Sequence, residues 1–218
     1  RSGGPDPMTP RGAATLLAAL ALPTGLLAQP APSGATTQRH APVTLPAVQA
    51  TGPMFLDARR SRIGFDVRTR IGQRIEGNFP HFEGRIEVLS DGRHQVHLKM
   101  YTRSVEIPGK DRYTGWMRGE DFFDAQRHPA VEFDSLPYDP ATVAQGGDIQ
   151  GRLMLRGVSH PEILRVERAA CDRPGYDCDV VSRGTILRGR YGMDNWQLAL
   201  SDRVTFVLRA RLSEAPKP

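Results

Sequence analysis

Alternation of apolar and polar residues at every second position is the feature that most restricts how this chain folds. It is clearest in Ile63–Val67, Val96–Met100 and Val131–Phe133. Side chains on a strand point alternately to opposite faces, so the pattern places apolar residues on one face of a sheet. Ser90-Asp91-Gly92 lies between two such runs and is a hairpin signal. Because no helix-length segments alternate with the strands, we predict an antiparallel sheet.

Glycines inside the predicted strands favour a barrel over a sandwich. Four glycines lie inside the predicted strands: Gly64, Gly77, Gly84 and Gly151. A glycine inside a strand usually marks a bend or a bulge, and a sheet that closes on itself needs such corners. We therefore expect an all-β, antiparallel β-barrel of about eight strands, with a short helix after the fourth strand.

The segment Gly119–Phe133 (GEDFFDAQRHPAVEF) changes from an acidic, helix-compatible turn to strand alternation. Pro129 forces this break, because proline fixes φ and disfavours the helical region for the residue before it. The adjacent Phe122 and Phe123 are either two core aromatics at a corner or a lid over an apolar cavity. Under the lid hypothesis, Trp116 and Phe122 lie at the mouth of the barrel.

The N-terminal quarter of the chain differs in composition from the rest. Residues 1–28 form a short extension and a leader-like segment, with an apolar run at Ala13–Leu22 that Pro23 ends. A membrane-spanning helix is the alternative, but it needs about 20 apolar residues. Residues 29–53 are rich in Pro, Ala and Thr and are expected to form an extended linker. The predicted barrel domain covers residues 54–213.

Charge and motifs argue against several classes of function. The net charge is +5, but the arginines are spread along the chain as on a solvated sheet face, and no nucleic-acid-binding motif accompanies them. His94 and His97 lie three apart on a predicted strand, so they point to opposite faces and cannot share a metal ion. We find no phosphate loop or nucleophile elbow and expect no cofactor, metal or catalytic residue. Asp121 or His128 would be the acid or base if the chain were an enzyme.

Cys171 and Cys178 are the two cysteines, and they flank a Pro174-Gly175 turn signal. In an exported protein this arrangement predicts a disulfide. Two free thiols, or a redox pair with unusual spacing, are the alternatives.

Several motifs, in order, resemble the YceI-like family. They include Gly77–Ile86 (GNFPHFEGRI), Asp121–Ala125 (DFFDA), Gly151–Pro161 with its L-x-L-R-G-V-x-x-P pattern, and Tyr191–Met193. The resemblance spans about residues 54–212. It implies a periplasmic, lipocalin-like barrel that binds a polyisoprenoid, a quinone, or a fatty amide or acid in its interior. It carries over no catalytic residues.

We therefore predict a binding protein that carries or stores a long apolar ligand in the cell envelope, with affinity set mainly by chain length. The alternatives are an enzyme that uses the barrel as a reaction chamber and a ligand-free structural protein. A transient membrane contact and a homodimer are further expectations. The residues expected to contact the ligand share an inward position or a place at the mouth: Phe65, Val67, Phe82, Leu98, Trp116, Phe122, Phe133, Leu153, Leu155 and Phe206.

Overall fold

The computed structural model describes residues 52–213. The predicted leader (1–28) and the predicted linker up to residue 51 lie outside the described residues. No helix in the described range is long and apolar enough to cross a membrane.

Within residues 52–213, ten strands make one sheet, and four short helices interrupt it. The strands are β1 (Met54–Phe55), β2 (Arg62–Thr69), β3 (Arg74–Asn78), β4 (Phe82–Val88), β5 (His94–Tyr101), β6 (Ala130–Ser135), β7 (Gly147–Leu155), β8 (Val158–Val166), β9 (Val180–Leu187) and β10 (Leu200–Ala210). The helices are the 3₁₀ turns η1 (Thr102–Ser104) and η2 (Arg188–Tyr191) and the α-helices α1 (Asp111–Arg118) and α2 (Ala141–Gln145).

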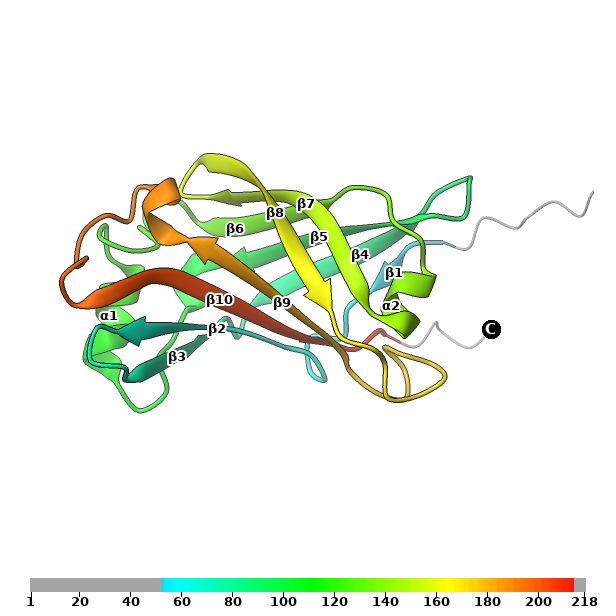
Figure 1. The fold of residues 1–218 in the computed structure, drawn as a ribbon, viewed down its shortest axis with the longest axis horizontal. Coiled ribbons are helices and arrows are strands. Elements are labelled where there is room, and N and C mark those ends of the chain that lie inside the picture. Colours follow the sequence, from blue (N-terminus) through cyan, green and yellow to red (C-terminus); the bar gives the residue numbers. More distant parts are fainter. Residues whose placement is uncertain (1–51, 214–218) are drawn as a thin grey trace, which may run out of the picture. The chain divides into compact units, whose positions relative to one another are not determined.

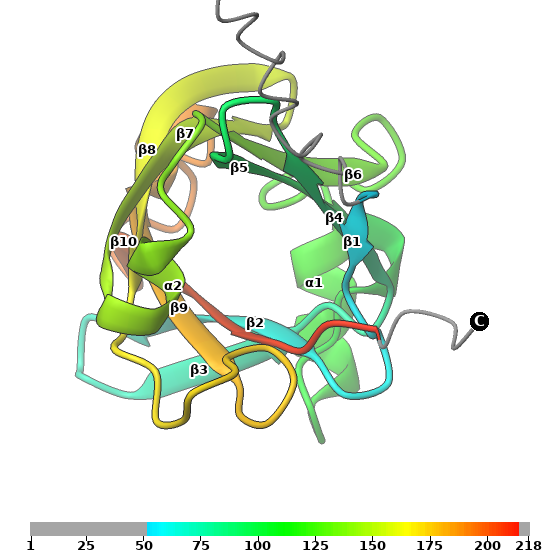
Figure 2. The ribbon, with the colours of Figure 1, turned by 90° about the vertical axis from the view of Figure 1, so that its right-hand side faces the viewer.

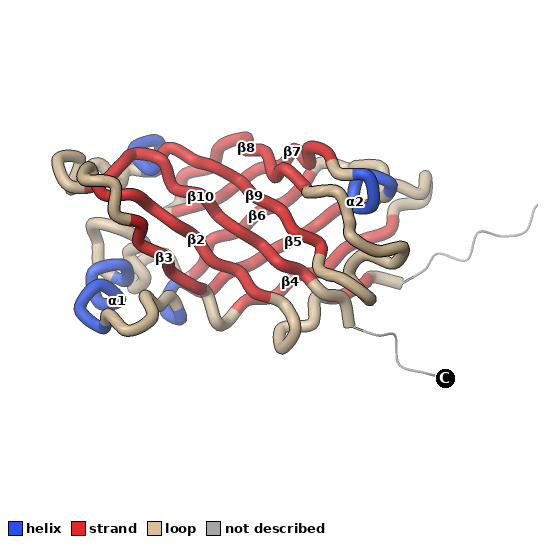
Figure 3. The backbone as a smooth tube through the Cα atoms, turned by 60° about the horizontal axis from the view of Figure 1, so that its bottom comes forward, coloured by secondary structure: helices blue, strands red, loops and turns tan. Residues whose placement is uncertain are grey.

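All neighbouring strands are antiparallel, in the order β1-β4-β5-β6-β7-β8-β9-β10-β2-β3. The sheet curls around a central axis, with the strands at a slant to it, as a barrel requires (Figures 2 and 3). A bridge between Leu56 and Leu212 joins the first and last segments of the domain. The predicted all-β antiparallel barrel is confirmed.

The strand count and one helix differ from the prediction. The two-residue β1 adds a strand that is too short to show alternation. α1 follows the predicted fourth long strand, but α2 lies between β6 and β7, where we predicted no helix. Its five residues are too few to show helical periodicity. The hairpin predicted at Ser90–Gly92 is confirmed, with Gly92 at φ 83°.

The interior glycines do not mark bulges. Strand register runs unbroken through Gly64, Gly77, Gly84 and Gly151. The register shift of β10 lies instead between Leu200 and Val204. A bulge, one of the two features expected at these glycines, is therefore absent there.

The barrel has two distinct ends (Figure 1). We call the end with α1, the β2–β3 turn and the η2–β10 loop the α1 end. The end with β1, α2 and the loop between β8 and β9 is the α2 end.

Candidate ligand-binding cavity

A cavity of about 270 Å³ occupies the α2 end of the barrel. Its wall comes from β1, the inward positions of the long strands, α2 and the loop that contains Pro174 and Tyr176. The period-two pattern explains the strand contribution, because Val96 and Leu98, two apart on β5, both face it. The apolar lining residues are Met54, Leu56, Ile86, Val96, Leu98, Phe133, Pro140, Val143, Ile149, Leu164, Val166, Pro174, Val180, Leu208, Ala210 and Leu212.

Several of these apolar side chains are only half-buried, among them Leu56, Val96, Val143 and Leu164. In a barrel whose interior is filled, inward positions would be fully buried. Their partial exposure shows that the α2 end is open and that apolar surface remains to be covered there.

The polar residues of the lining are Arg85, His94, Tyr138, Tyr176 and Ser182. Arg85 is paired with Glu87, and the Tyr176 hydroxyl contacts the Met54 sulfur, which leaves the three uncharged side chains of His94, Tyr138 and Ser182. His94 and Tyr138 exchange two backbone hydrogen bonds, of 2.9 and 2.8 Å, and their rings meet edge to face at 6.1 Å. Within residues 52–213, none of the three side chains makes a hydrogen bond to another protein group. Their donors and acceptors are therefore available to a molecule in the cavity.

Burial sets the charge state of two of these groups. It raises the pKa of Tyr138 to about 12, so the phenol stays protonated at neutral pH. Burial also lowers the pKa of His94, although the Asp139 carboxylate acts in the opposite direction. Both groups are uncharged near pH 7.

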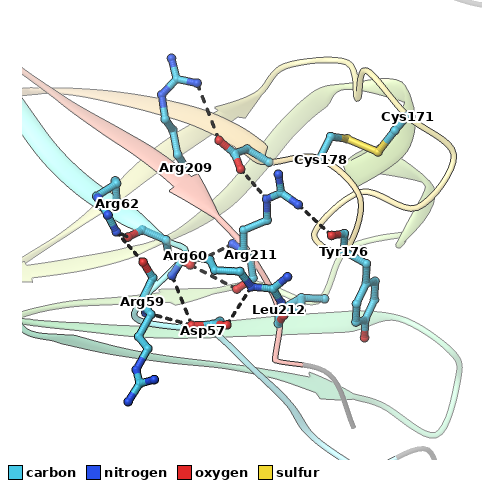
Figure 4. A network of polar contacts seen from close by, with 12 residues as sticks. Asp57, Arg59, Arg60, Arg62, Cys171, Tyr176, Cys178, Arg209, Arg211 and Leu212 are labelled. Carbon is cyan, nitrogen blue, oxygen red and sulfur yellow. Dashed lines mark hydrogen bonds and ion pairs between the residues drawn. A yellow bond between two sulfur atoms is a disulfide. The ribbon is translucent and has the colours of Figure 1, made fainter.

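A polar network frames the mouth (Figure 4). Arg60 donates to the Asp57 carboxylate at 2.8 Å and to the Leu212 carbonyl at 2.6 Å, which ties the segment before β2 to the end of β10. Arg211 donates to Asp179 at 2.5 Å and to the Tyr176 carbonyl at 2.7 Å. These contacts fix the loop that carries the lining residues Pro174 and Tyr176.

The same loop contains the Cys171–Cys178 disulfide, so the predicted pairing is confirmed. The Gly175 N–H donates to the Cys178 carbonyl at 2.8 Å, and the Leu212 N–H donates to the Gly175 carbonyl at 2.8 Å. The disulfide therefore closes a turn that packs directly on the C-terminal end of the barrel wall.

The predicted site residues are divided between the two ends. Leu98 and Phe133 line the 270 Å³ cavity. They also border a void of about 30 Å³ deeper in the barrel, together with Leu153 and Phe206. Phe65, Val67, Phe122, Leu155 and Phe206 surround a void of about 20 Å³ near α1. Phe82 belongs to the same buried core.

The α1 end is filled by aromatic rings. Phe123 packs against Phe65 and Phe79 at centroid distances of 5.4 and 5.3 Å, and Phe206 lies 6.3 Å from Phe65. Trp116 and Phe122, expected at the mouth of the barrel, therefore lie at the end opposite the 270 Å³ cavity. Phe122 is buried at the closed end, and Trp116 lies on its outer surface, 37% exposed. The Gly119–Phe133 segment therefore helps to fill the α1 end of the barrel, whereas the open mouth of the cavity lies at the α2 end.

Asp121 and His128, the acid and base of the alternative enzyme hypothesis, contact other protein groups. Asp121 accepts hydrogen bonds from Trp196 and Asn195, which lower the pKa of its carboxyl group. His128 lies 4.0 Å from the buried Asp124. Neither residue lines the 270 Å³ cavity. In the described part of the chain, no three His, Cys, Asp or Glu side chains gather to hold a metal ion.

Sequence reasoning identified only Leu98 and Phe133 of the cavity lining, and four of the residues that it missed are Leu56, Tyr138, Val143 and Tyr176. All four lie outside the long strands, so the period-two signal could not reveal them. The only available signal was their apolar or aromatic character in segments that otherwise read as loops.

Comparisons with known proteins agree on the fold. A family model described as a YceI-like domain matches residues 55–212. The crystal structure of Burkholderia cenocepacia BcnA is 18% identical, with a TM-score of 0.59, and the match covers 73% of this chain and 99% of that one. The polyisoprenoid binding domain from Saccharophagus degradans, implicated in plant cell wall breakdown, is 20% identical, with a TM-score of 0.55 and coverage of 75% and 98%. No match was found among curated proteins.

Proposed function

The chain belongs to the YceI-like family, and from this premise we propose that it binds one long apolar molecule in the cavity at the α2 end. The observation that carries the proposal is the 270 Å³ of space behind half-buried apolar side chains. The Saccharophagus degradans relative, described as a polyisoprenoid binding domain, supports a polyisoprenoid, a quinone or another lipid as the ligand.

The cavity volume indicates how much of the ligand is enclosed. A cavity of about 150 Å³ binds benzene, so 270 Å³ takes roughly ten to twelve carbons. At about 0.8 kcal/mol per CH₂, ten carbons contribute roughly 8 kcal/mol before ordering costs. A longer chain would extend from the mouth.

The polar groups of the wall favour an uncharged head group. His94, Tyr138 and Ser182 offer hydrogen bonds but no charge. Arg85, the charged residue in the lining, is already paired with Glu87 at 3.0 Å, so burying a carboxylate or phosphate beside these groups would leave a charge without a free counter-ion, which is costly. A quinone carbonyl, an alcohol or an amide fits this wall better, although the length of the apolar chain contributes more to the affinity than the head group does.

We also propose that the protein works in the periplasm as a carrier or store rather than as a catalyst. The Cys171–Cys178 disulfide supports an oxidising compartment. The leader that would direct export lies outside the described residues. A homodimer stays a prediction.

The direct test is mass spectrometry of an organic extract of protein purified from its natural host, followed by titration with polyprenols, quinones and fatty amides. Calorimetry is the suitable readout, because both tryptophans of the chain lie at the α1 end, away from the cavity.

A matched pair of variants tests the location. Ile149 faces the cavity, while its neighbour Gln150 points outward from β7. Ile149→Trp is expected to fill the space and lower affinity at least about tenfold, while Gln150→Trp binds like the parent protein. Equal binding by both variants would place the ligand elsewhere. If no lipid binds the parent protein, the ligand-free structural alternative is favoured.

A further inference from the structure

The α1 end exposes large apolar side chains on two neighbouring loop tips. Ile71, at the tip of the β2–β3 turn, is 91% exposed, and Leu198, in the loop before β10, is 96% exposed. Arg70 ties the two loops together: its N–H donates to the Ala199 carbonyl at 2.8 Å, and its Nε donates to the Gln197 carbonyl at 3.0 Å. The two tips are therefore parts of one surface.

Exposed tryptophans continue this surface toward α1. Trp196 and Trp116 are 42% and 37% exposed, and their rings lie 5.4 Å apart. Trp196 has φ 67°, a value that bulky residues rarely adopt. Asp121 holds it there by accepting a hydrogen bond from its indole N–H at 3.1 Å. Trp196 thus combines an unfavourable backbone conformation with an aromatic ring that stays at the surface.

Cations surround these apolar groups. The Arg112 guanidinium lies 4.9 Å from the Trp116 ring, and Lys110 Nζ lies 5.3 Å from the Tyr113 ring. Among the described residues, Arg70, Lys110, Arg112, Arg118 and Arg203 form no ion pair with a carboxylate. Two carboxylates lie in the same part of the chain, Asp111 in α1 and Asp194 in the loop before β10. Neither side chain makes a hydrogen bond to a protein group in the described range.

Cations without a carboxylate partner among the described residues are not confined to the α1 end. At the α2 end, Arg60, Arg165 and Arg211 are paired with Asp57, Asp148 and Asp179 at 2.8, 3.0 and 2.5 Å, but Arg62 and Arg168 form no such pair. The α1 end is distinguished by having such cations beside two aliphatic side chains that are 91% and 96% exposed and two partly exposed tryptophans.

We propose that the α1 end docks reversibly on an anionic lipid bilayer, with Ile71 and Leu198 inserted and the tryptophans at the headgroup level. Tryptophan and tyrosine favour the membrane interface, and each Arg or Lys near an anionic surface adds about 1 kcal/mol. Side chains that project singly from loop tips suit a fluid surface better than the packed core of a protein interface. Docked in this way, the cavity mouth at the other end faces the aqueous phase.

The test uses vesicles of phosphatidylcholine, alone or mixed equally with phosphatidylglycerol. Because Trp116 and Trp196 are the two tryptophans of the chain, intrinsic fluorescence reports docking directly. We expect a blue shift and co-sedimentation with the mixed vesicles, and weaker binding to phosphatidylcholine alone or at high salt.

The double variant Ile71→Ser/Leu198→Ser is expected to weaken vesicle binding by about tenfold or more. Its matched control is Ile163→Ser/Leu136→Ser, which removes an exposed isoleucine from β8 and an exposed leucine from the segment after β6, 49% and 58% exposed, both away from the α1 end. The control should bind like the parent protein. Absence of binding by the parent, unchanged binding by the first pair, or equal loss by both pairs would overturn the proposal.

If circular dichroism shows that the first pair loses its strand signal, Ile71→Trp decides the matter. A larger interfacial side chain at an open loop tip should strengthen binding to the mixed vesicles. Unchanged or weaker binding by Ile71→Trp would also overturn the proposal.

Discussion

Gly77 and Gly151 show how a missing side chain shapes this barrel. A Cβ atom at Gly77 would lie 2.4 Å from the Phe65 ring, and one at Gly151 would lie 2.4 Å from the Phe133 ring. Phe65 and Gly77 are direct partners across β2 and β3. Each glycine provides the space in which a neighbouring ring lies flat on the sheet.

Gly151→Ala should therefore destabilise the protein. The new methyl group would meet the Phe133 ring and, at 2.6 Å, the Asp134 carbonyl oxygen, which cannot easily move. We expect a loss of about 1–3 kcal/mol in the free energy of unfolding, measured in urea. Gly115→Ala is the control, because nothing lies within 4 Å of its Cβ position in α1, and helix propensity predicts a gain of up to about 1 kcal/mol. Equal effects would contradict the packing account.

His94 should make binding depend on pH. Its folded-state pKa is lowered by burial, so the unfolded state takes up a proton more readily than the folded state does. A neutral lipid that covers the imidazole would disfavour its protonated form further. Stability and affinity for a neutral lipid should be constant above the ordinary histidine pKa and should fall as the pH drops below about 6.5. Calorimetric titration across this range is the measurement. His94→Gln should flatten the profile, and an unchanged slope in that variant would assign the effect to another group.

At the scale of secondary structure, the sequence was most informative for the long strands. Alternation at Ile63–Val67 and Val96–Met100 identified β2 and β5, because burial on one face imposes period two. β1 and α2 escaped, since two and five residues cannot show a period. Their positions follow from tertiary contacts, such as the pairing of Met54 with Ile86.

The disulfide-closed loop is an element with both a structural and a functional consequence. Replacing Cys171 and Cys178 by serine should cost about 2.5 kcal/mol by the chain-entropy relation for a short loop. Because Pro174 and Tyr176 line the cavity, the same variant should also release a bound lipid faster. Urea unfolding and a dissociation-rate measurement test both effects. If ligand release is unchanged while stability falls, the loop supports only the fold.

For the whole molecule, the cavity predicts a limit to chain-length dependence. Affinity in a series of alcohols or amides should rise with each carbon up to roughly ten to twelve and then level off, because further carbons remain outside the cavity. Calorimetry with such a series is the measurement. A continued rise beyond this length would mean that the aromatic plug opens to admit the chain.

The fold class followed from the sequence, but the location of the cavity did not. Which end of a barrel is filled depends on rings that come from distant strands, such as Phe65, Phe123 and Phe206, and on how they meet. Alternation assigns each residue to the inner face but does not say whether the space beside it is occupied. The predicted set was therefore inward-facing in large part, while only Leu98 and Phe133 reached the cavity.

The aromatic plug formed by Phe65, Phe79 and Phe123 makes the proposed binding chamber a blind tube. A tube with a single opening imposes an order on exchange: a chain enters tail first and must leave head first. The polar end of a bound lipid would then always be the part shown to an acceptor, and no second molecule could push it through from behind. Cargo would change hands by withdrawal at the mouth, so the acceptor rather than the barrel would decide when the lipid is released.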